Sequence, residues 1–317
     1  MSTARRRALL ALALAACTRS PERAPAAPRD TVVVFTAASL GTPIAAALDS
    51  FARRTGAVVR QESGASIELA RRITELHRVP DLIALADHEV FPELLLPRVT
   101  PWYALFARNR MVVMYTDRSR GASEIDSTNW TRVLLRPDVV VGRADPAVAP
   151  VGYRTLLVYA LAERHQHAPG LAARLAARSP PRLQRANAVE LAALLAAGEL
   201  DYVVDYESLA RANGFRILRL PAAIDLSDPE RAAEYGQAVV HVPSRGGDSA
   251  TRRGAPIVYA ASVPRAAPHR EAGVRALAFL LGPEGQALLR ARDLDPMRVP
   301  ALVGDSIPAL VRRAAEP

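Results

Sequence analysis

The sequence predicts an α/β protein with two lobes, each a mostly parallel sheet flanked by helices. From Thr31 onward, short β-branched runs alternate with Ala-, Leu- and Arg-rich segments at helical spacing. The 317 residues, half of them apolar, suffice for two domains with sizeable cores. Extended runs at 102–107 and 111–115 lead out of the first α/β block. Two lobes joined by a hinge therefore predict a ligand site in the cleft between them.

The first block shows this alternation most clearly. An apolar stripe of Ile44, Leu48 and Phe51 marks its first helix, which Gly56 should end. The expected elements are strand Val32–Phe35, the helix ending near Gly56, a strand at Val58–Val59, helix Ile67–His77 and strand Asp81–Leu85.

The second block repeats the pattern, and the last helices are expected to pack back on the first lobe. We expect lobe I to comprise residues 31–108 plus 240–317, and lobe II residues 109–239. The expected elements are helix Trp130–Leu135, strand Val139–Gly142, a long amphipathic helix Gly152–Glu163, helix Asn187–Ala197, strand Tyr202–Asp205, strand Ile257–Ala261, and helices Ala272–Leu281 and Gly285–Ala291.

The N-terminus has the pattern of a secretory signal, assigned to residues 1–16. Arg5 to Arg7 precede an apolar run, 8–16, that is too short to span a bilayer. The run ends in Leu-Ala-Ala-Cys, which resembles a lipobox, so Cys17 is the expected lipidation site. It is the only cysteine, which excludes a disulfide framework. Residues 17–30, rich in Pro, Ala and charge, would then be a tether, anchoring the protein at the extracytoplasmic (periplasmic) face of a membrane.

The chain has a formal net charge of +9, and all of its basic residues other than histidine are arginines, since it has no lysine. Removal of the signal would take three arginines away and leave +6. The arginines are scattered rather than clustered, and no nucleic-acid reader motif is present, which argues against nucleic-acid binding. A modest positive field would still help to collect anions.

Two strand-to-helix junctions carry a serine each. In TVVVFTAASLGTP, Thr31 to Pro43, the serine is Ser39, and in ESGAS it is Ser66. In a parallel sheet both would lie at the carboxyl edge beside helix N-termini, where backbone donors and the helix dipole favour an anion. Small neighbours would let a ligand approach the backbone. Each serine could instead be a helix N-cap without a ligand.

The motifs TAASL, ESGASIELARRI, DLIALAD, WYALFARNRMVVMYT, NWTRVLLRPDVVVG, DPAVAPVGYRTLLV and DYVVDYESLA resemble, in this order, the molybdate/tungstate-binding lipoproteins of ABC transporters. The resemblance runs from about Thr31 to about Leu289. It implies a type II periplasmic-binding fold that closes on a tetraoxo dianion and delivers it to a membrane permease. It also implies a monomer, no enzymatic activity and no cofactor besides the ligand.

The resemblance also implies a set of ligand contacts from both lobes. Tyr206 is one of these contacts; alternatively, it could be a packed core tyrosine whose hydroxyl is hydrogen-bonded within the protein. Carried over residue by residue, the contacts fall on Ala38, Ser39, Ser66, Ala149, Pro150, Val151, Ala188 after Asn187, Asp205 and Tyr206.

Two positions depart from the archaeal-type members of this family. Ala149 stands where those have a carboxylate, and Asp205 where they have a glutamate; together those carboxylates bind the metal atom. Six-coordinate binding therefore does not follow here, and Asp205 alone is the candidate ligand of the metal. An ionised carboxylate about 4 Å from a dianion is repelled by roughly 4 kcal/mol per unit charge. We therefore expect Ser39, Ser66, Tyr206 and backbone amides to hold the anion, with Asp205 tuning selectivity.

Other functions remain open at this point. The same fold could bind another oxyanion such as sulfate, or act as a tethered sensor without a transporter. A secreted serine hydrolase would need a positioned base, and neither serine has the G-x-S-x-G context nor a histidine at partner spacing. His165 and His167 lie two residues apart on a helix and would point away from each other, which argues against a metal ion bound by both. Glu207 is expected to face solvent.

Overall fold

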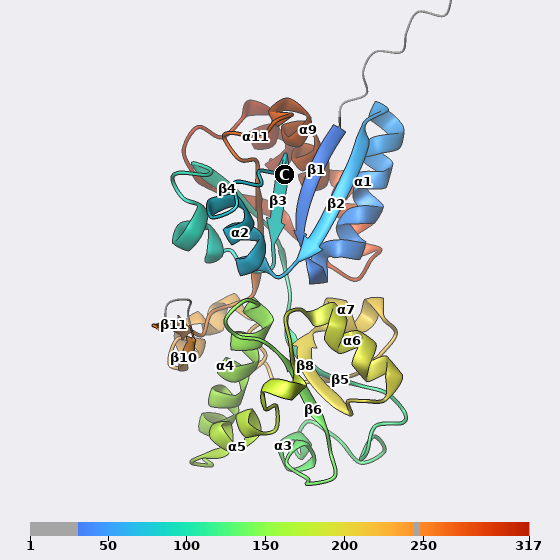
Figure 1. The fold of residues 1–317 in the computed structure, drawn as a ribbon, viewed down its shortest axis with the longest axis vertical. Helices are drawn as coiled ribbons and strands as arrows, with labels where there is room; N and C mark the ends of the chain where they lie inside the picture. The colour runs from blue at the N-terminus through green and yellow to red at the C-terminus, as the bar shows by residue number, and fades with distance from the viewer. Residues whose placement is uncertain (1–30, 244–247, 317) are drawn as a thin grey trace, which may run out of the picture.

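The computed structural model describes residues 31–243 and 248–316, which form two lobes stacked along the long axis of the molecule (Figure 1). The predicted signal peptide, Cys17 and the tether lie outside the described residues. In the part of the chain that is described, no helix is long and apolar enough to cross a bilayer.

The first lobe is built on a six-stranded sheet with the order β13-β4-β12-β3-β1-β2. Helix α9 packs on β1 and β3, and α10 packs on α1, so the last helices return to this lobe as predicted. Its elements are β1 (Thr31–Ala37), η1 (Ala38–Leu40), α1 (Gly41–Thr55), β2 (Val58–Gly64), α2 (Ser66–Thr74), β3 (Leu82–Leu85), the π-helix η2 (Phe91–Leu95), β4 (Trp102–Arg108), β12 (Val258–Ser262), α9 (Arg270–Leu281), α10 (Pro283–Arg290), β13 (Asp295–Gly304) and α11 (Ala309–Ala315).

The second lobe is built on a five-stranded sheet with the order β7-β6-β8-β5-β9. Helices α4 and α6 both contact β6 and β8. Its elements are β5 (Met111–Tyr115), α3 (Trp130–Leu134), β6 (Val141–Ala144), α4 (Pro150–His165), α5 (Leu171–Ala177), η3 (Pro181–Leu183), β7 (Gln184–Arg185), α6 (Ala188–Ala197), β8 (Tyr202–Tyr206), α7 (Glu207–Ala212) and β9 (Arg216–Arg219).

The chain returns from the second lobe through η4 (Pro229–Arg231), α8 (Ala232–Tyr235) and the antiparallel hairpin β10 (Val239–Pro243) and β11 (Ser249–Arg253). The hairpin lies beside α4 (Figure 1). Two segments that run between the lobes are joined where the Asn109 N–H donates to the Ile257 carbonyl at 3.3 Å. The lobe boundaries remain a prediction; the boundary at residue 240 falls inside β10.

The α/β class with two helix-flanked sheets is confirmed, but the sheets are mixed rather than mostly parallel. Strand β1 is parallel to β2 and β3, and β6 is parallel to β7 and β8. Strands β12, β4 and β13 pair antiparallel in the first sheet, and β5 pairs antiparallel with β8 and β9 in the second. The reason is that β4, β5 and β12 belong to segments running between the lobes, so they join their sheets without a helical crossover.

The burial of individual strands and helices follows from their sequences and from the elements packed against them. Strands β3, β5 and β8 are buried at every position, which fits their apolar sequences; Asp205 of β8 is the one charged residue among them. Gly56 ends α1 in the left-handed conformation, as its position predicts. Helix α4, expected to be amphipathic, is instead buried over most of its length, because α5 and β10 cover the surface that the sheet leaves free.

Candidate functional site

A small cavity lies where the two lobes meet. About 260 Å³ of space between atoms belongs to it, and part of this space is open to solvent. All of its lining residues are neutral, and most are alanine or glycine. They are Ala37, Ala38, Ser39, Gly64, Ala65, Ser66 and Ala86 from the first lobe, and Ala149, Pro150, Val151, Asn187, Ala188 and Tyr206 from the second.

The cavity is formed at the carboxyl ends of parallel strands in both sheets. Strands β1, β2 and β3 end at it from one side, and β6, β7 and β8 from the other. Three of these strand ends lead into helices α2, α4 and α6, whose N-termini point at the same space. Opposed helix N-termini concentrate positive potential there without a cationic side chain.

Backbone donors are available at these N-termini. Helices α2 and α4 have no side-chain cap, while α6 has one, because Asn187 accepts from the Glu190 N–H at 3.1 Å. The first N–H groups of a helix have no intrahelical acceptor, which leaves those of Ser66, Val151 and Ala188 free for another partner. Pro150 occupies the first position of α4 and has no N–H to contribute.

The two serines have different partners. The Oγ of Ser66 accepts the Ala86 N–H at 3.1 Å, so its own proton is free to donate into the cavity. The Oγ of Ser39 is buried and has no hydrogen-bond partner among the described residues. Ser39 lies beside the Tyr259 hydroxyl. Burial raises the pKa of this hydroxyl, and its polar neighbours, Ser39 among them, lower the pKa in part. Neither serine caps its helix, so the capping alternative does not account for them.

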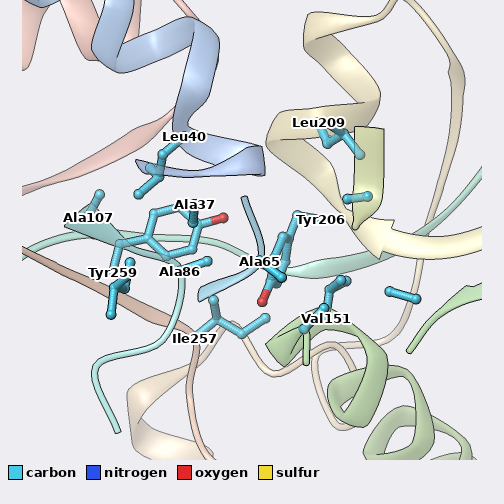
Figure 2. Close-up of a cluster of buried hydrophobic side chains, with 14 of the residues drawn as sticks. Ala37, Leu40, Ala65, Ala86, Ala107, Val151, Tyr206, Leu209, Ile257 and Tyr259 are labelled. Atoms are coloured by element: carbon cyan, nitrogen blue, oxygen red, sulfur yellow. The ribbon is translucent and has the colours of Figure 1, made fainter. Parts of the chain in front are cut away.

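Tyr206 ends β8 and is 2% exposed. Its hydroxyl accepts from Arg154 Nη1 at 2.6 Å, and its ring meets Tyr259 edge to face at 5.9 Å. Figure 2 shows Tyr206 near Ala65 of the first lobe and Val151 at the start of α4, and all three line the cavity. Burial raises the pKa of Tyr206, so the hydroxyl keeps a proton to donate. The tyrosine is therefore both packed and available to a ligand.

Asp205 is fully buried directly beside Tyr206 but is not among the residues that line the cavity. One carboxyl oxygen accepts the Tyr206 N–H at 2.7 Å, and the other has no partner in the described structure. Burial raises the pKa of this carboxyl to about 7. Near neutral pH, Asp205 can therefore carry a proton rather than a full negative charge, and the protonated carboxyl does not repel a dianion.

The arrangement can hold a small, fully deprotonated oxyanion. The polar side chains that line the cavity, those of Ser39, Ser66, Asn187 and Tyr206, are all neutral and can donate, and the Asn187 side-chain oxygen already caps α6. No cluster of potential metal ligands exists in residues 31–243 and 248–316. No histidine or carboxylate lines the cavity as a base for either serine.

A family model described as bacterial extracellular solute-binding protein matches residues 32–292. The chain belongs to this family. The solute-binding protein is 39% identical over 260 residues to an uncharacterized solute-binding protein of Petrotoga mobilis, covering 81% of each chain. It is 31% identical over 326 residues to the molybdate/tungstate-binding protein WtpA of Thermococcus kodakarensis, covering 94% of this chain and 91% of WtpA.

The fold is similar to the sulfate-binding protein SubI from Mycobacterium tuberculosis H37Rv, with a TM-score of 0.59, 17% identity and 90% coverage of both chains. The type II periplasmic-binding fold predicted from the motifs is thereby confirmed. Membership of the family also makes this chain a solute-binding protein rather than an enzyme.

Eight of the nine residues predicted to contact the ligand line the one cavity, from Ala38 to Tyr206; Asp205 lies outside it. This placement brings them together but does not test their contact with a ligand. His165 and His167 are exposed, and α4 ends at His165. The expectation for Glu207 was wrong: it is 7% exposed, because Arg110, Arg211 and Arg219 surround its carboxylate.

Sequence reasoning missed Ala86 and Arg154. For Asp87 it favoured a hinge or capping role but did not predict the pairing with Arg154. Arg154 forms an ion pair with Asp87 at 3.0 Å, and both are buried. A signal existed, because Arg154 interrupts the apolar stripe of α4 that includes Val151 and Val158. A charged residue in such a stripe indicates a buried partner.

Proposed function

We propose that this solute-binding protein captures molybdate or tungstate and delivers it to the membrane permease of an ABC transporter. The observation that carries the proposal is the cavity itself, in which uncapped helix N-termini and neutral hydroxyls from both lobes converge on one small space. A tetraoxo dianion matches it, because its oxygens accept hydrogen bonds in every direction and carry no proton that would need an acceptor.

The similarity to WtpA over 94% of this chain supports molybdate and tungstate as the ligands. Sulfate is the second candidate, because it has the same charge and shape and because the fold is similar to a sulfate-binding protein. The size of the closed cavity must separate the two, since neutral donors alone do not distinguish tetrahedral dianions.

Asp205 has a secondary role in this proposal. Its carboxyl is protonated or turned away from the anion, and it tunes selectivity rather than providing the main attraction. Asp205→Ala should therefore change the ratio of molybdate to tungstate affinity in calorimetric titrations while binding persists. Complete loss of binding would show that the carboxylate is an essential ligand of the metal.

The proposal includes the placement of the protein. The family is extracellular, and lipidation of Cys17 would hold the binding lobes near the permease on the outer face of a membrane. Mass spectrometry of the protein isolated from membranes should find a diacylated Cys17 as the first residue. An unmodified Cys17 preceded by residues 1–16 would contradict the anchor.

The ligand is tested by thermal unfolding and calorimetry with molybdate, tungstate, sulfate, phosphate and chromate. A ligand present at about 100 times its dissociation constant stabilises the folded state by about 2.7 kcal/mol. We expect molybdate and tungstate to stabilise most. Stabilisation by sulfate alone would move the proposal to sulfate uptake, and no stabilisation by any oxyanion would refute it.

A further inference from the structure

Arg154 occupies an unusual position behind the wall of the cavity. It lies on α4 of the second lobe, one turn after Val151, and is 4% exposed. Burial alone would lower the pKa of the guanidinium, but Asp87 and its other neighbours raise it, so the group stays charged. A buried charge of this kind is retained only with good partners.

The partners of Arg154 come from both lobes. Within its own lobe, Nη1 donates to the Tyr206 hydroxyl at 2.6 Å. Toward the first lobe, the same nitrogen donates to the Ala86 carbonyl at 2.7 Å, and Nη2 pairs with Asp87 at 3.0 Å. Ala86 and Tyr206 both line the cavity, from opposite sides. One guanidinium therefore spans the lobe interface and holds two walls of the site.

These bonds fix what the Tyr206 hydroxyl can do. A phenol has one proton, and its oxygen accepts from Arg154 in this arrangement. Its proton is thereby directed elsewhere, and the cavity is the adjoining space. The bonds to Ala86 and Asp87 exist only while the lobes are together, because those residues follow β3 of the first lobe.

We propose that Arg154 is a positioning residue that makes lobe closure and ligand recognition one event: it docks on Ala86 and Asp87 as the lobes meet and thereby holds the Tyr206 hydroxyl as a donor to the bound oxyanion. This inference rests on the proposed function. Arg154 does not line the cavity, yet it would raise the affinity for the oxyanion. It would do so by orienting the Tyr206 hydroxyl, in addition to joining the two lobes.

A second arginine provides the comparison. Arg252 of β11 makes a bidentate ion pair with Glu93 of η2, at 2.5 and 2.9 Å, and packs over the Tyr153 ring of α4 at 5.2 Å. It thus also connects the first lobe with the second. No contact joins it to Tyr206 in the described structure. Arg252 therefore serves as a matched control for interlobe pairing without tyrosine positioning.

The test is a double-mutant cycle on the full mature protein with molybdate and tungstate. Arg154→Lys keeps the charge, but its single ammonium cannot serve three acceptors with the geometry of a guanidinium. We expect Arg154→Lys to weaken binding about tenfold in the wild-type background and about twofold or less in the Tyr206→Phe background. Arg252→Gln should weaken binding by the same factor in both backgrounds.

A spectroscopic measurement separates positioning from general structural damage. Ultraviolet resonance Raman difference spectra against Tyr206→Phe report whether the phenol donates, accepts or does both. We expect both in the ligand-bound wild type and loss of the accepting component in Arg154→Lys. Should Arg154→Lys fail to fold, the Arg154→Met/Asp87→Asn pair, which removes both buried charges, enters the same cycle with the same expectation.

Equal factors for the Arg154 variants in both backgrounds, or an unchanged Tyr206 spectrum, would overturn the inference while leaving oxyanion binding intact. If the wild type binds none of the oxyanions, the proposed function fails and this inference fails with it. The two failures are thus distinguishable by the wild-type titration alone.

Discussion

Ser39 and Ser66 occupy equivalent strand-to-helix junctions but differ in their bonds. Ser39 Oγ is buried without a hydrogen-bond partner in the described structure, whereas Ser66 Oγ accepts the Ala86 N–H. Ser39→Ala should therefore leave the free energy of unfolding of the ligand-free protein within about 0.5 kcal/mol of wild type, since only a weak contact with the Tyr259 hydroxyl is lost. Its oxyanion affinity should fall about tenfold or more, because a donor to a charged ligand is removed.

Ser66→Ala is the matched comparison. It should lower the oxyanion affinity similarly, and it should also destabilise the ligand-free protein by about 1–3 kcal/mol, because the buried Ala86 N–H loses its acceptor. Urea unfolding without ligand and calorimetry with molybdate measure the two effects. A large loss of stability in Ser39→Ala would contradict a role that depends on the ligand.

Asp205 predicts a pH dependence of stability. Burial raises the pKa of its carboxyl from the ordinary 3.8 to about 7, so between these values the folded protein holds a proton that the unfolded chain releases. Its contribution to stability is therefore fully present below about pH 4 and is lost as pH rises through about 7, by roughly 4 kcal/mol. Asp205→Asn has no such titration. The difference in unfolding free energy between wild type and Asp205→Asn should fall over this range, and a flat difference would contradict the assignment.

Residue-level prediction depends on whether the local sequence carries the chemistry. The small residues around Ser39 and Ser66 indicate a site lined by backbone, and residues of both stretches line the cavity. Arg154 was not predicted and Glu207 was predicted wrongly, because their burial depends on how separate segments pack together. Arg154 meets residues of the other lobe, and Glu207 is buried under three arginines from separate elements.

At the scale of elements, the start of α4 depends on a close backbone approach. A Cβ at Gly152 would lie 2.4 Å from the Ala144 carbonyl oxygen and 2.7 Å from the Pro146 nitrogen, and neither atom can move aside easily. Gly152→Ala should therefore displace the N-terminus of α4 from the cavity, cost about 1–3 kcal/mol of stability and weaken oxyanion binding.

The control for this prediction lies on the same helix. Ala160→Gly should weaken α4 by about 0.5–1 kcal/mol through backbone entropy without moving its N-terminus. Its oxyanion affinity should stay at the wild-type value in calorimetry. Equal losses of affinity in both variants would mean that helix stability, rather than the position of the N-terminus, controls binding.

Long apolar or periodic segments, such as β1, α1, α9 and β8, could be predicted from the sequence because their patterns repeat over several residues. Short edge strands could not: β7 has two residues, and β9 is largely exposed or half-buried. Strand direction was also mispredicted. Strands β4, β5 and β12 belong to segments that run between the lobes and pair antiparallel, and the local sequence does not indicate which strand will be the neighbour in the sheet.

For the whole molecule, the two-lobed form could be predicted from extended runs between α/β blocks, but the contacts that close it could not. Arg252 joins the hairpin to Glu93 of the first lobe with a side chain only 16% exposed. Arg252→Gln should therefore favour opening and speed ligand dissociation roughly threefold to tenfold, with the association rate little changed. Stopped-flow displacement of molybdate measures both rates.

Arg216→Gln is the control, because Arg216 pairs with Asp117 at 2.8 Å within the second lobe and both side chains are exposed. This variant should release ligand at the wild-type rate. Equal acceleration in both variants would point to an effect of net charge rather than of lobe closure.

The most direct measurement is a crystal structure of the protein grown with tungstate, with the tungsten located by its anomalous scattering. We predict one tungsten between the lobes, with its oxygens about 2.7–3.0 Å from the hydroxyls of Ser39, Ser66 and Tyr206 and from the amides at the starts of α2, α4 and α6. Tungsten bound elsewhere, or a closed protein whose cavity holds none, would contradict an oxyanion site built from neutral donors.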